Sequence, residues 1–317
     1  MADFFSMFYR WIQLPFRYLV AGCLLINATT GFGQSLFLPP SITYRPERLR
    51  TVVISEAATG IAISAGLYFL WYRKHPRSHF HFFNDNSEWL QMDKLGHATT
   101  AYNIGAIQYD LMRWCGVQNE TSIWVGGLTA IGYMSIVEVF DGFSSKWGFS
   151  KGDMLANIFG AALFAAQQKG WNQQRIELKW SFHVSPYAAY YPAELGSNFL
   201  SRMLKDYNGQ TYWLSFNIAS FLPSNSGFPS WLNMSMGYGG RGMIGANTNP
   251  DSINGKSIPP FPRYRSFYFA PDADLFRIPT RSSLFNGVAY LTRFSKIPSP
   301  SLEWSKFKGL YFHPIYY

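Results

Sequence analysis

The sequence predicts an α+β protein in which a bundle of about four apolar helices precedes an antiparallel, aromatic-rich β region. Up to about residue 168 the chain consists mainly of long apolar segments, whereas after it apolar and polar residues alternate as they do in strands. Aromatic side chains make up 19% of the chain and charged ones only 14%, against about 25% charged in average soluble proteins. The C-terminal region is therefore expected to be a sheet or a partial barrel.

The first 33 residues are typical of an export signal. Arg10 and Arg17 precede an apolar run at residues 18–26, and Gly31-Phe32-Gly33 is an acceptable small-x-small cleavage site. Lipid attachment at Cys23, which ends a lipobox-like Val-Ala-Gly-Cys sequence, is an alternative, and a retained membrane anchor is a third. Apolar residues continue after Cys23, which favours ordinary cleavage. In each case the chain is expected in the periplasm or at the periplasmic face of an outer membrane.

A long apolar segment follows the predicted linker at residues 34–50 and opens a helical domain assigned to residues 51–170. This segment, Thr51–Tyr72, has Glu56 as its only charge and is about 20 residues long, which is enough to cross a bilayer. The alternative is a fully buried helix that packs through small residues such as Gly60. The sequence leaves both alternatives open.

Polar residues recur at helical spacing inside the next two apolar segments. Asp93 and His97 are four residues apart and share one helix face, and Lys94 lies beside them. The following segment ends in Glu138 and Asp141, which are three residues apart and can also point the same way. Each segment therefore presents a small polar group on an otherwise apolar helix.

A third segment repeats the pattern with Asp153 and Asn157, four residues apart, and Ser150 is placed to cap its first turn. If the three helices pack together, one lysine, one histidine, four carboxylates and an amide converge. An unpaired buried charge loses several kcal/mol of solvation. We therefore expect these groups to pair with one another, to bind a cation or to line a wet cleft.

The order of these motifs resembles a known family. Asp-Lys-x-x-His, Glu-x-x-Asp and Asp-x-x-x-Asn-x-x-Gly, with a Gly/Trp/Ser-rich turn before the last, are similar to the YfiM-like predicted periplasmic lipoproteins, a domain of unknown function. More distantly they resemble VanZ-like membrane proteins. The resemblance covers roughly residues 90–167. It implies a small helical domain at the cell envelope and no established reaction.

Residues 171–317 form the second predicted domain, in which short alternating segments are separated by Pro/Ser/Gly/Asn turns. A transmembrane barrel usually needs at least eight strands, and Pro314 is expected to interrupt the last strand, so a partial barrel or a small antiparallel sheet is favoured. The predicted strands are Arg175–Ser185, Thr211–Leu222, Trp231–Tyr238, Tyr264–Ala270 and Gly309–Tyr317. The other predicted elements are short helices at Leu195–Lys205 and Asn286–Phe294 and a mobile loop at Gly239–Pro262.

The charge balance predicts the kind of partner. The formal net charge of +9 favours an anionic surface such as phospholipid or lipopolysaccharide, and abundant Tyr, Trp and Phe suit the headgroup region of a membrane. Export and the lack of a dense Lys/Arg stripe argue against nucleic acid. An outer-membrane protein is a further candidate partner, with the aromatic sheet as the docking surface.

The leading functional hypothesis is a non-catalytic envelope protein whose polar cluster is structural or binds an anionic lipid headgroup or small ligand. In that hypothesis Lys94, Asp141, Asp153 and Asn157 are the ligand-binding residues. An accessory subunit of an outer-membrane assembly is an alternative. The sequence names neither a metal nor a cofactor.

The other alternative is a metal-dependent or acid/base-dependent hydrolase that acts on a lipid or cell-wall substrate. His97 would be the general base, Asp93 would orient it, and Glu138 would act as the acid or hold a cation. A His-Glu-x-x-His motif does not occur in the chain, so the common zinc-protease mechanism is not indicated.

Overall fold

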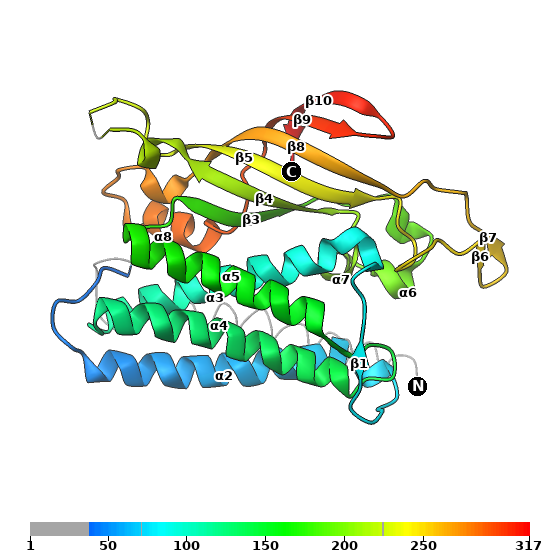
Figure 1. Cartoon of the computed structure of the whole chain (residues 1–317), viewed down its shortest axis with the longest axis horizontal. Helices are drawn as coiled ribbons and strands as arrows, with labels where there is room; N and C mark the ends of the chain where they lie inside the picture. The colour runs from blue at the N-terminus through cyan, green and yellow to red at the C-terminus, as the bar shows by residue number, and fades with distance from the viewer. Residues whose placement is uncertain (1–37, 71, 224) are drawn as a thin grey trace.

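The computed structural model describes residues 38–70, 72–223 and 225–317. A layer of long helices lies beneath an antiparallel sheet, and helices and strands run in roughly the same direction (Figure 1). The predicted α+β class is thereby confirmed. The predictions for residues 1–33, including cleavage near Gly33 and lipid attachment at Cys23, lie outside the described residues.

The helical layer contains four long helices, three of which pack closely together. Phe164 of the last helix fills the space between them and is fully buried. Ser150 caps that helix as expected, because its hydroxyl accepts a hydrogen bond of 3.1 Å from the backbone N–H of Asp153. The four helices are α2 (Pro46–Leu70), α3 (Met92–Trp114), α4 (Asn119–Gly142) and α5 (Lys151–Trp171).

Small residues allow the packed helices to approach one another. A Cβ atom on Gly160 would lie 2.0 Å from the carbonyl oxygen of Ala98, and one on Gly126 would lie 2.6 Å from the carbonyl oxygen of Gly105. Neither helix pair could therefore come this close with a side chain at these positions. Interfaces built from small residues are common in membrane helix bundles, where backbones pack closely without a hydrophobic driving force.

Helix α2 runs beneath α4 and is largely exposed (Figure 1), although Val52 near its start is buried against Met112 and Cys115. Only 6% of its most apolar stretch is buried, so the prediction of a fully buried helix is wrong. Gly60 does approach Tyr133 of α4, at 3.3 Å from an added Cβ, but this is a local contact. By length and composition both Pro46–Phe69 and Asn119–Gly142 could cross a membrane, and the second of these is 33% buried.

The sheet has six antiparallel strands in the order β10-β9-β8-β5-β4-β3 and is not closed into a barrel. Strand β9 was not predicted, because Pro300 lies inside it. Pro300 and Pro314 both fall at the register shift between β9 and β10, where no ladder hydrogen bond is required, so the last strand continues past Pro314. The strands are β3 (Ile176–Phe182), β4 (Gln210–Asn217), β5 (Leu232–Arg241), β8 (Tyr264–Ala273), β9 (Ser299–Ser305) and β10 (Gly309–Tyr316).

The remaining elements are short. The helix predicted at Leu195–Lys205 is two helices, because Gly196 has a φ of 98° and ends the first of them. The region Gly239–Pro262 is not one loop, since it contains the end of β5 and a small hairpin. The helices are α6 (Pro192–Leu195), α7 (Phe199–Lys205) and α8 (Ser283–Thr292), and the short strands are β1 (Phe82–Phe83), β2 (Phe149–Ser150), β6 (Ser252–Ile253) and β7 (Lys256–Ser257). Single 3₁₀ turns occur at Tyr72–Lys74, Glu88–Gln91, Tyr187–Ala189, Ile218–Phe221 and Leu275–Arg277.

The contact between α3 and α5 can be tested by adding one methyl group. Gly160→Ala is expected to lower the free energy of unfolding by about 1–3 kcal/mol, because the new Cβ clashes with the backbone of α3. Gly132→Ala is the matched control: it lies inside α4 with no atom within 4 Å of an added Cβ, so it should leave stability unchanged or slightly raised. Denaturant unfolding of both variants measures the difference, and equal stabilities would contradict the close contact.

Candidate functional site, a buried histidine and carboxylate cluster

The polar residues of three helices meet at one end of the helical layer, next to β1 and β2 (Figure 1). At this end lie the first turns of α3 and α5 and the last turn of α4. Because each polar residue shares its helix face with a partner three or four positions away, the helices bring whole groups together. Six of the seven residues singled out from the sequence contact one another here: Asp93, Lys94, His97, Glu138, Asp153 and Asn157.

His97 is at the centre of this cluster. Its Nδ1 atom lies 3.1 Å from Oδ1 of Asn157 and 3.6 Å from Oε1 of Glu138. Its Nε2 atom lies 4.0 Å from Oδ1 of Asp93 and 4.0 Å from Oδ1 of Asp153. The imidazole therefore has an amide and a carboxylate on one side and two carboxylates on the other.

Lys94 neutralises part of the cluster and recruits a residue that the sequence analysis missed. Its Nζ atom is 2.7 Å from Oδ1 of Asp153 and 2.7 Å from Oδ1 of Asp85. Asp85 belongs to the loop between β1 and α3, which β1 holds in place by pairing with β2 through Phe83 and Ser150. The Ser150 hydroxyl also donates a 2.6 Å hydrogen bond to Asp85. An aspartate in an Asn-Asp-Asn turn has no periodic signal, so only the fold reveals its role.

Tyr207 closes the cluster from the sheet side. It follows α7, and its hydroxyl donates a short hydrogen bond to Oδ1 of Asp93. Tyr212 of β4 covers the same helix turn, because an added Cβ on Gly96 would lie 2.8 Å from its hydroxyl oxygen. Neither tyrosine was singled out from the sequence, since more than a hundred residues separate them from Asp93. The β-rich region thus contributes to the site as well as the helices.

Asp141 is the one predicted site residue that does not contact the other six. Its Oδ1 atom accepts a 2.8 Å hydrogen bond from the hydroxyl of Tyr72, and it interacts with the cluster only through longer-range charge. Glu138, one turn earlier on α4, lies inside the cluster, and its Oε2 atom accepts a 3.0 Å hydrogen bond from the backbone N–H of Ser150.

The cluster is nearly sealed. Glu138, Asp153 and Asn157 are 1%, 3% and 0% exposed, whereas the side chain of Asp93 is 27% exposed and forms its open edge. With every group ionised, the five carboxylates of Asp85, Asp93, Glu138, Asp141 and Asp153 outweigh Lys94 and a protonated His97 by three charges. Such an excess is unfavourable at low dielectric, so protons or a cation must offset it.

The pKa values of the buried acids reflect this excess. Burial, reinforced by neighbouring carboxylates, raises the pKa of Glu138 to about 8. For the same reasons the pKa of Asp141 and that of Asp153 are raised to about 7. Burial alone would lower the pKa of His97, but the carboxylates of Asp93, Asp153 and Glu138 outweigh it and raise that pKa. The cluster therefore holds protons at neutral pH that isolated side chains would release.

Three of these residues are arranged as metal ligands. One ligand atom each from Asp93, His97 and Asp153 lie within 4.8 Å of one another. Beside them, Oε1 of Glu138 and Nδ2 of Asn157 are buried without a hydrogen-bond partner in the described part of the chain. Orphaned buried polar atoms are rare in folded proteins, and Oε1 of Glu138 can accept a further donor or a cation.

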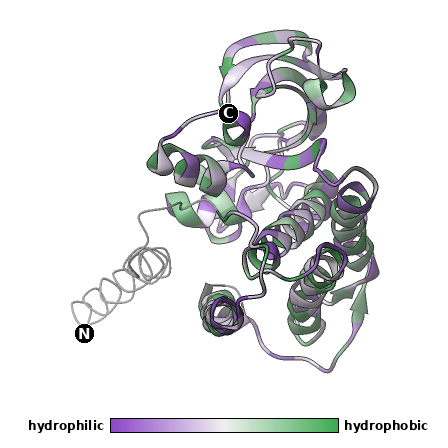
Figure 2. Ribbon diagram, turned by 90° about the vertical axis from the view of Figure 1, so that its left-hand side faces the viewer, coloured by the Kyte–Doolittle hydropathy of each residue, from purple (hydrophilic) through white to green (hydrophobic). Residues whose placement is uncertain are grey.

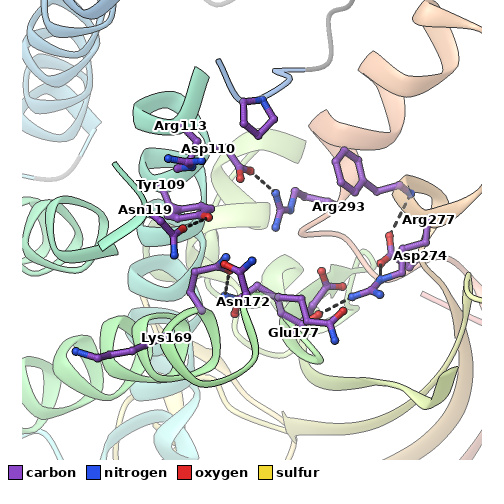
Figure 3. Close-up of a pocket in the computed structure, with 15 residues that line it drawn as sticks. Tyr109, Asp110, Arg113, Asn119, Lys169, Asn172, Glu177, Asp274, Arg277 and Arg293 are labelled. Carbon is purple, nitrogen blue, oxygen red and sulfur yellow. Dashed lines mark hydrogen bonds and ion pairs between the residues drawn. The ribbon is translucent and has the colours of Figure 1, made fainter. Parts of the chain in front are cut away.

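A second concave region lies at the other end of α3 and α5 (Figure 3). It has a volume of about 760 Å³ and was not predicted from the sequence. Its charges are mainly paired, since Arg293 lies 2.7 Å from Asp110 and Arg277 lies 2.9 Å from Asp274. Several amide side chains, among them Asn119 and Asn172, complete the lining. Its lining offers both hydrogen-bond donors and acceptors, together with the rings of Tyr109 and Phe276.

The fold and the cluster define an α+β protein whose helical part carries a buried histidine and carboxylate centre. In a comparison with known sequences, residues 81–169 match the family described as predicted periplasmic lipoprotein (DUF2279). The matched segment runs from β1 into α5 and includes every site residue predicted from the sequence, together with Asp85. This similarity is consistent with export to the cell envelope. No curated protein and no solved structure matches the chain.

The raised pKa values predict that stability falls as pH increases. The pKa of Glu138 is about 8 in the folded protein and near 4.5 when unfolded, so between these values the unfolded state ionises while the folded state keeps its proton. The raised pKa values of Asp153 and His97 act in the same direction. We expect the free energy of unfolding, measured with a chelator present, to decline from pH 5 to pH 8.

Glu138→Gln tests the assignment of this slope. The variant cannot ionise, so its stability should decline less steeply with pH than that of the unsubstituted protein. Glu194→Gln, at a surface ion pair with Lys146, serves as the control. A Glu138→Gln variant with an unchanged slope would show that the cluster is not the source.

Proposed function

We propose that the protein is a membrane-attached envelope protein whose histidine and carboxylate cluster holds a divalent metal cation. The arrangement of Asp93, His97 and Asp153, with ligand atoms within 4.8 Å of one another in a cluster of excess negative charge, carries the proposal. In this proposal residues 81–169 form a YfiM-like domain, and the more distant likeness to VanZ-like membrane proteins agrees with the exposed apolar helices.

The orientation of His97 supports a metal. Oδ1 of Asn157 accepts a hydrogen bond from Nδ1, so Nδ1 carries a proton. In the neutral imidazole, the lone pair of Nε2 then points between Asp93 and Asp153. Metal-binding histidines usually donate their other ring N–H to an oxygen acceptor in this way, which fixes the ring and its tautomer.

The donor set favours a particular class of ion. One imidazole nitrogen and two carboxylate oxygens suit zinc or another first-row transition metal better than calcium, which prefers six to eight oxygen ligands. A bound cation would also stabilise the ionised form of Asp153 and displace a proton from His97. Metal binding is therefore expected to release protons and to strengthen with rising pH.

The charge of the cluster argues for a cation rather than for an anionic headgroup. Carboxyl groups outnumber Lys94 and His97, and Lys94 is already engaged by Asp85 and Asp153, so the cluster offers an anion little positive charge. The formal net charge of +9 on the whole chain favours an anionic lipid or lipopolysaccharide partner that binds outside the cluster. Exposed apolar residues on α2, such as Ile54 and Ile61, provide the membrane attachment.

A hydrolase is the second candidate, and one observation favours it. With a pKa of about 8, Glu138 carries a proton at neutral pH and could serve as a general acid opposite His97. A lipid or cell-wall substrate would have to enter past Asp93, the most exposed member of the cluster. Because the centre is otherwise sealed, a small ion fits it more readily than such a substrate.

Metal analysis of the purified protein tests the proposal. We expect about one zinc or other transition-metal ion per chain after dialysis against trace metal, and a loss of most of this metal in Asp153→Asn and His97→Ala. Asp251→Asn, an exposed carboxylate directly before β6, is the control and should retain it. Circular dichroism confirms that each variant is folded. Folded protein that binds no metal at pH 8 would overturn the proposal.

Lys94 distinguishes a metal centre from a purely structural network. Lys94→Met removes the cation that lies between Asp85 and Asp153, so the metal-free variant should be less stable than the unsubstituted protein. If a metal can take over the neutralisation, added metal should restore most of the lost melting temperature. A purely structural network predicts the same destabilisation with no recovery.

A further inference from the structure

The inner face of the six-stranded sheet combines a cluster of Trp213, Tyr268 and Tyr316 with many buried polar side chains. Ser215, Asn233 and Asp272 point into the protein from β4, β5 and β8 and are almost fully buried. Lys179 of β3 donates a 2.8 Å hydrogen bond to Asp272, Ser215 donates one of 2.7 Å to the same oxygen, and Asn233 donates one of 3.0 Å to Ser215. These groups are satisfied by one another rather than by water.

The outer face of the same strands is apolar and exposed. Along β8, for example, Phe267 and Phe269 are 46% and 49% exposed. The residues that alternate with them, Ser266, Tyr268 and Ala270, are buried. The hydropathy colouring shows this alternation along the curled sheet (Figure 2). The large apolar residues exposed on this face of β4, β5, β8 and β9 are Leu214, Met236, Phe267, Phe269, Leu302 and Trp304.

This polarity is the reverse of that found in a sheet that faces water. One-sided antiparallel sheets in soluble proteins place apolar side chains inward and polar side chains outward. Strands that face lipid do the opposite, with apolar residues outward and polar residues inward. Each exposed apolar side chain would be unfavourable in water by about 25 cal/mol per Å².

We propose that the outer face of the β4, β5, β8 and β9 strands contacts the acyl chains of a lipid bilayer. The inference deepens the membrane attachment proposed above and is independent of the metal centre. It extends that attachment from the helices to the opposite side of the molecule.

Lipid explains the distribution of apolar surface better than a second copy of the chain. The sheet and α2 lie on opposite sides of the molecule (Figures 1 and 2), and α2 exposes Ile54, Ile61 and Phe69. A two-fold contact through the sheet would cover one of these surfaces and leave the other in water. A surrounding bilayer covers both.

The dimensions agree with an embedded position. At about 1.5 Å per residue, the 24 residues of α4 extend about 36 Å. At about 3.3 Å per residue, the 10 residues of β8 extend about 33 Å. The hydrocarbon core of a bilayer is about 30 Å thick, so both layers have the length needed to cross it.

Spin labels on the outer face test the inference. The full chain is reconstituted in vesicles of phosphatidylethanolamine and phosphatidylglycerol, with Leu302→Cys or Phe269→Cys carrying a nitroxide. Both side chains are exposed, so these substitutions should preserve the fold. Lys256→Cys, in the exposed β6–β7 hairpin, is the matched control, and unsubstituted protein corrects for labelling of native cysteines.

Oxygen concentrates in hydrocarbon, whereas a nickel chelate stays in water. We expect the ratio of oxygen to nickel accessibility to exceed one at positions 302 and 269 and to fall below one at position 256. Nickel accessibility at 302 and 269 equal to that at 256 would place the face in water and overturn the inference. Low accessibility to both reagents would indicate a protein contact, such as a second copy, and would also overturn it. Metal content measured in the same samples reports separately on the proposed centre.

Discussion

The contact of Lys94 with Asp85 and Asp153 is the interaction on which the site depends. It joins the start of α3, the loop after β1 and the start of α5, and it places a positive charge among carboxylates that could not otherwise share a sealed space. The close packing of Gly160 against Ala98 brings α3 and α5 near enough for this contact. The site therefore needs both the close helix packing and the charge pairs. Without Gly160 the carboxylates of α3 and α5 would lie farther apart, and without Lys94 they would repel one another.

The metal proposal follows from the charge that Lys94 leaves uncompensated. Three negative charges remain when all groups ionise, and burial raises the pKa values of Glu138 and Asp153, which favours their protonated forms. Bound protons and a bound divalent cation can each offset the negative charge of the carboxylates. A centre of this kind is sensitive to both pH and metal supply.

The sequence was sufficient to predict the helices and most of the polar cluster, because spacings of three and four residues define a helix face without knowledge of the fold. It could not predict Asp85 or Tyr207, which reach Asp93 and Lys94 through a strand pairing and a domain contact with no local signal. The strands showed a similar limit. The alternation of apolar and polar residues predicted five of the six strands of the sheet, but it does not show which face of a strand is buried. Strand β9 was missed because Pro300 lies inside it.

The proposed contact of the sheet with lipid is constrained by the edges of the sheet. The edge of β3 is covered at Trp180, whose backbone N–H donates to the carbonyl oxygen of Phe294 and whose carbonyl oxygen accepts from the backbone N–H of Lys296. Strand β10 pairs only with β9 among the described strands, so its outer backbone groups need water or another strand. Unpaired backbone groups cost several kcal/mol each in hydrocarbon. The bilayer should therefore contact the face formed by β4, β5, β8 and β9, while the edge of β10 lies at the headgroup boundary, where its exposed Tyr311 and Tyr317 are well suited to remain.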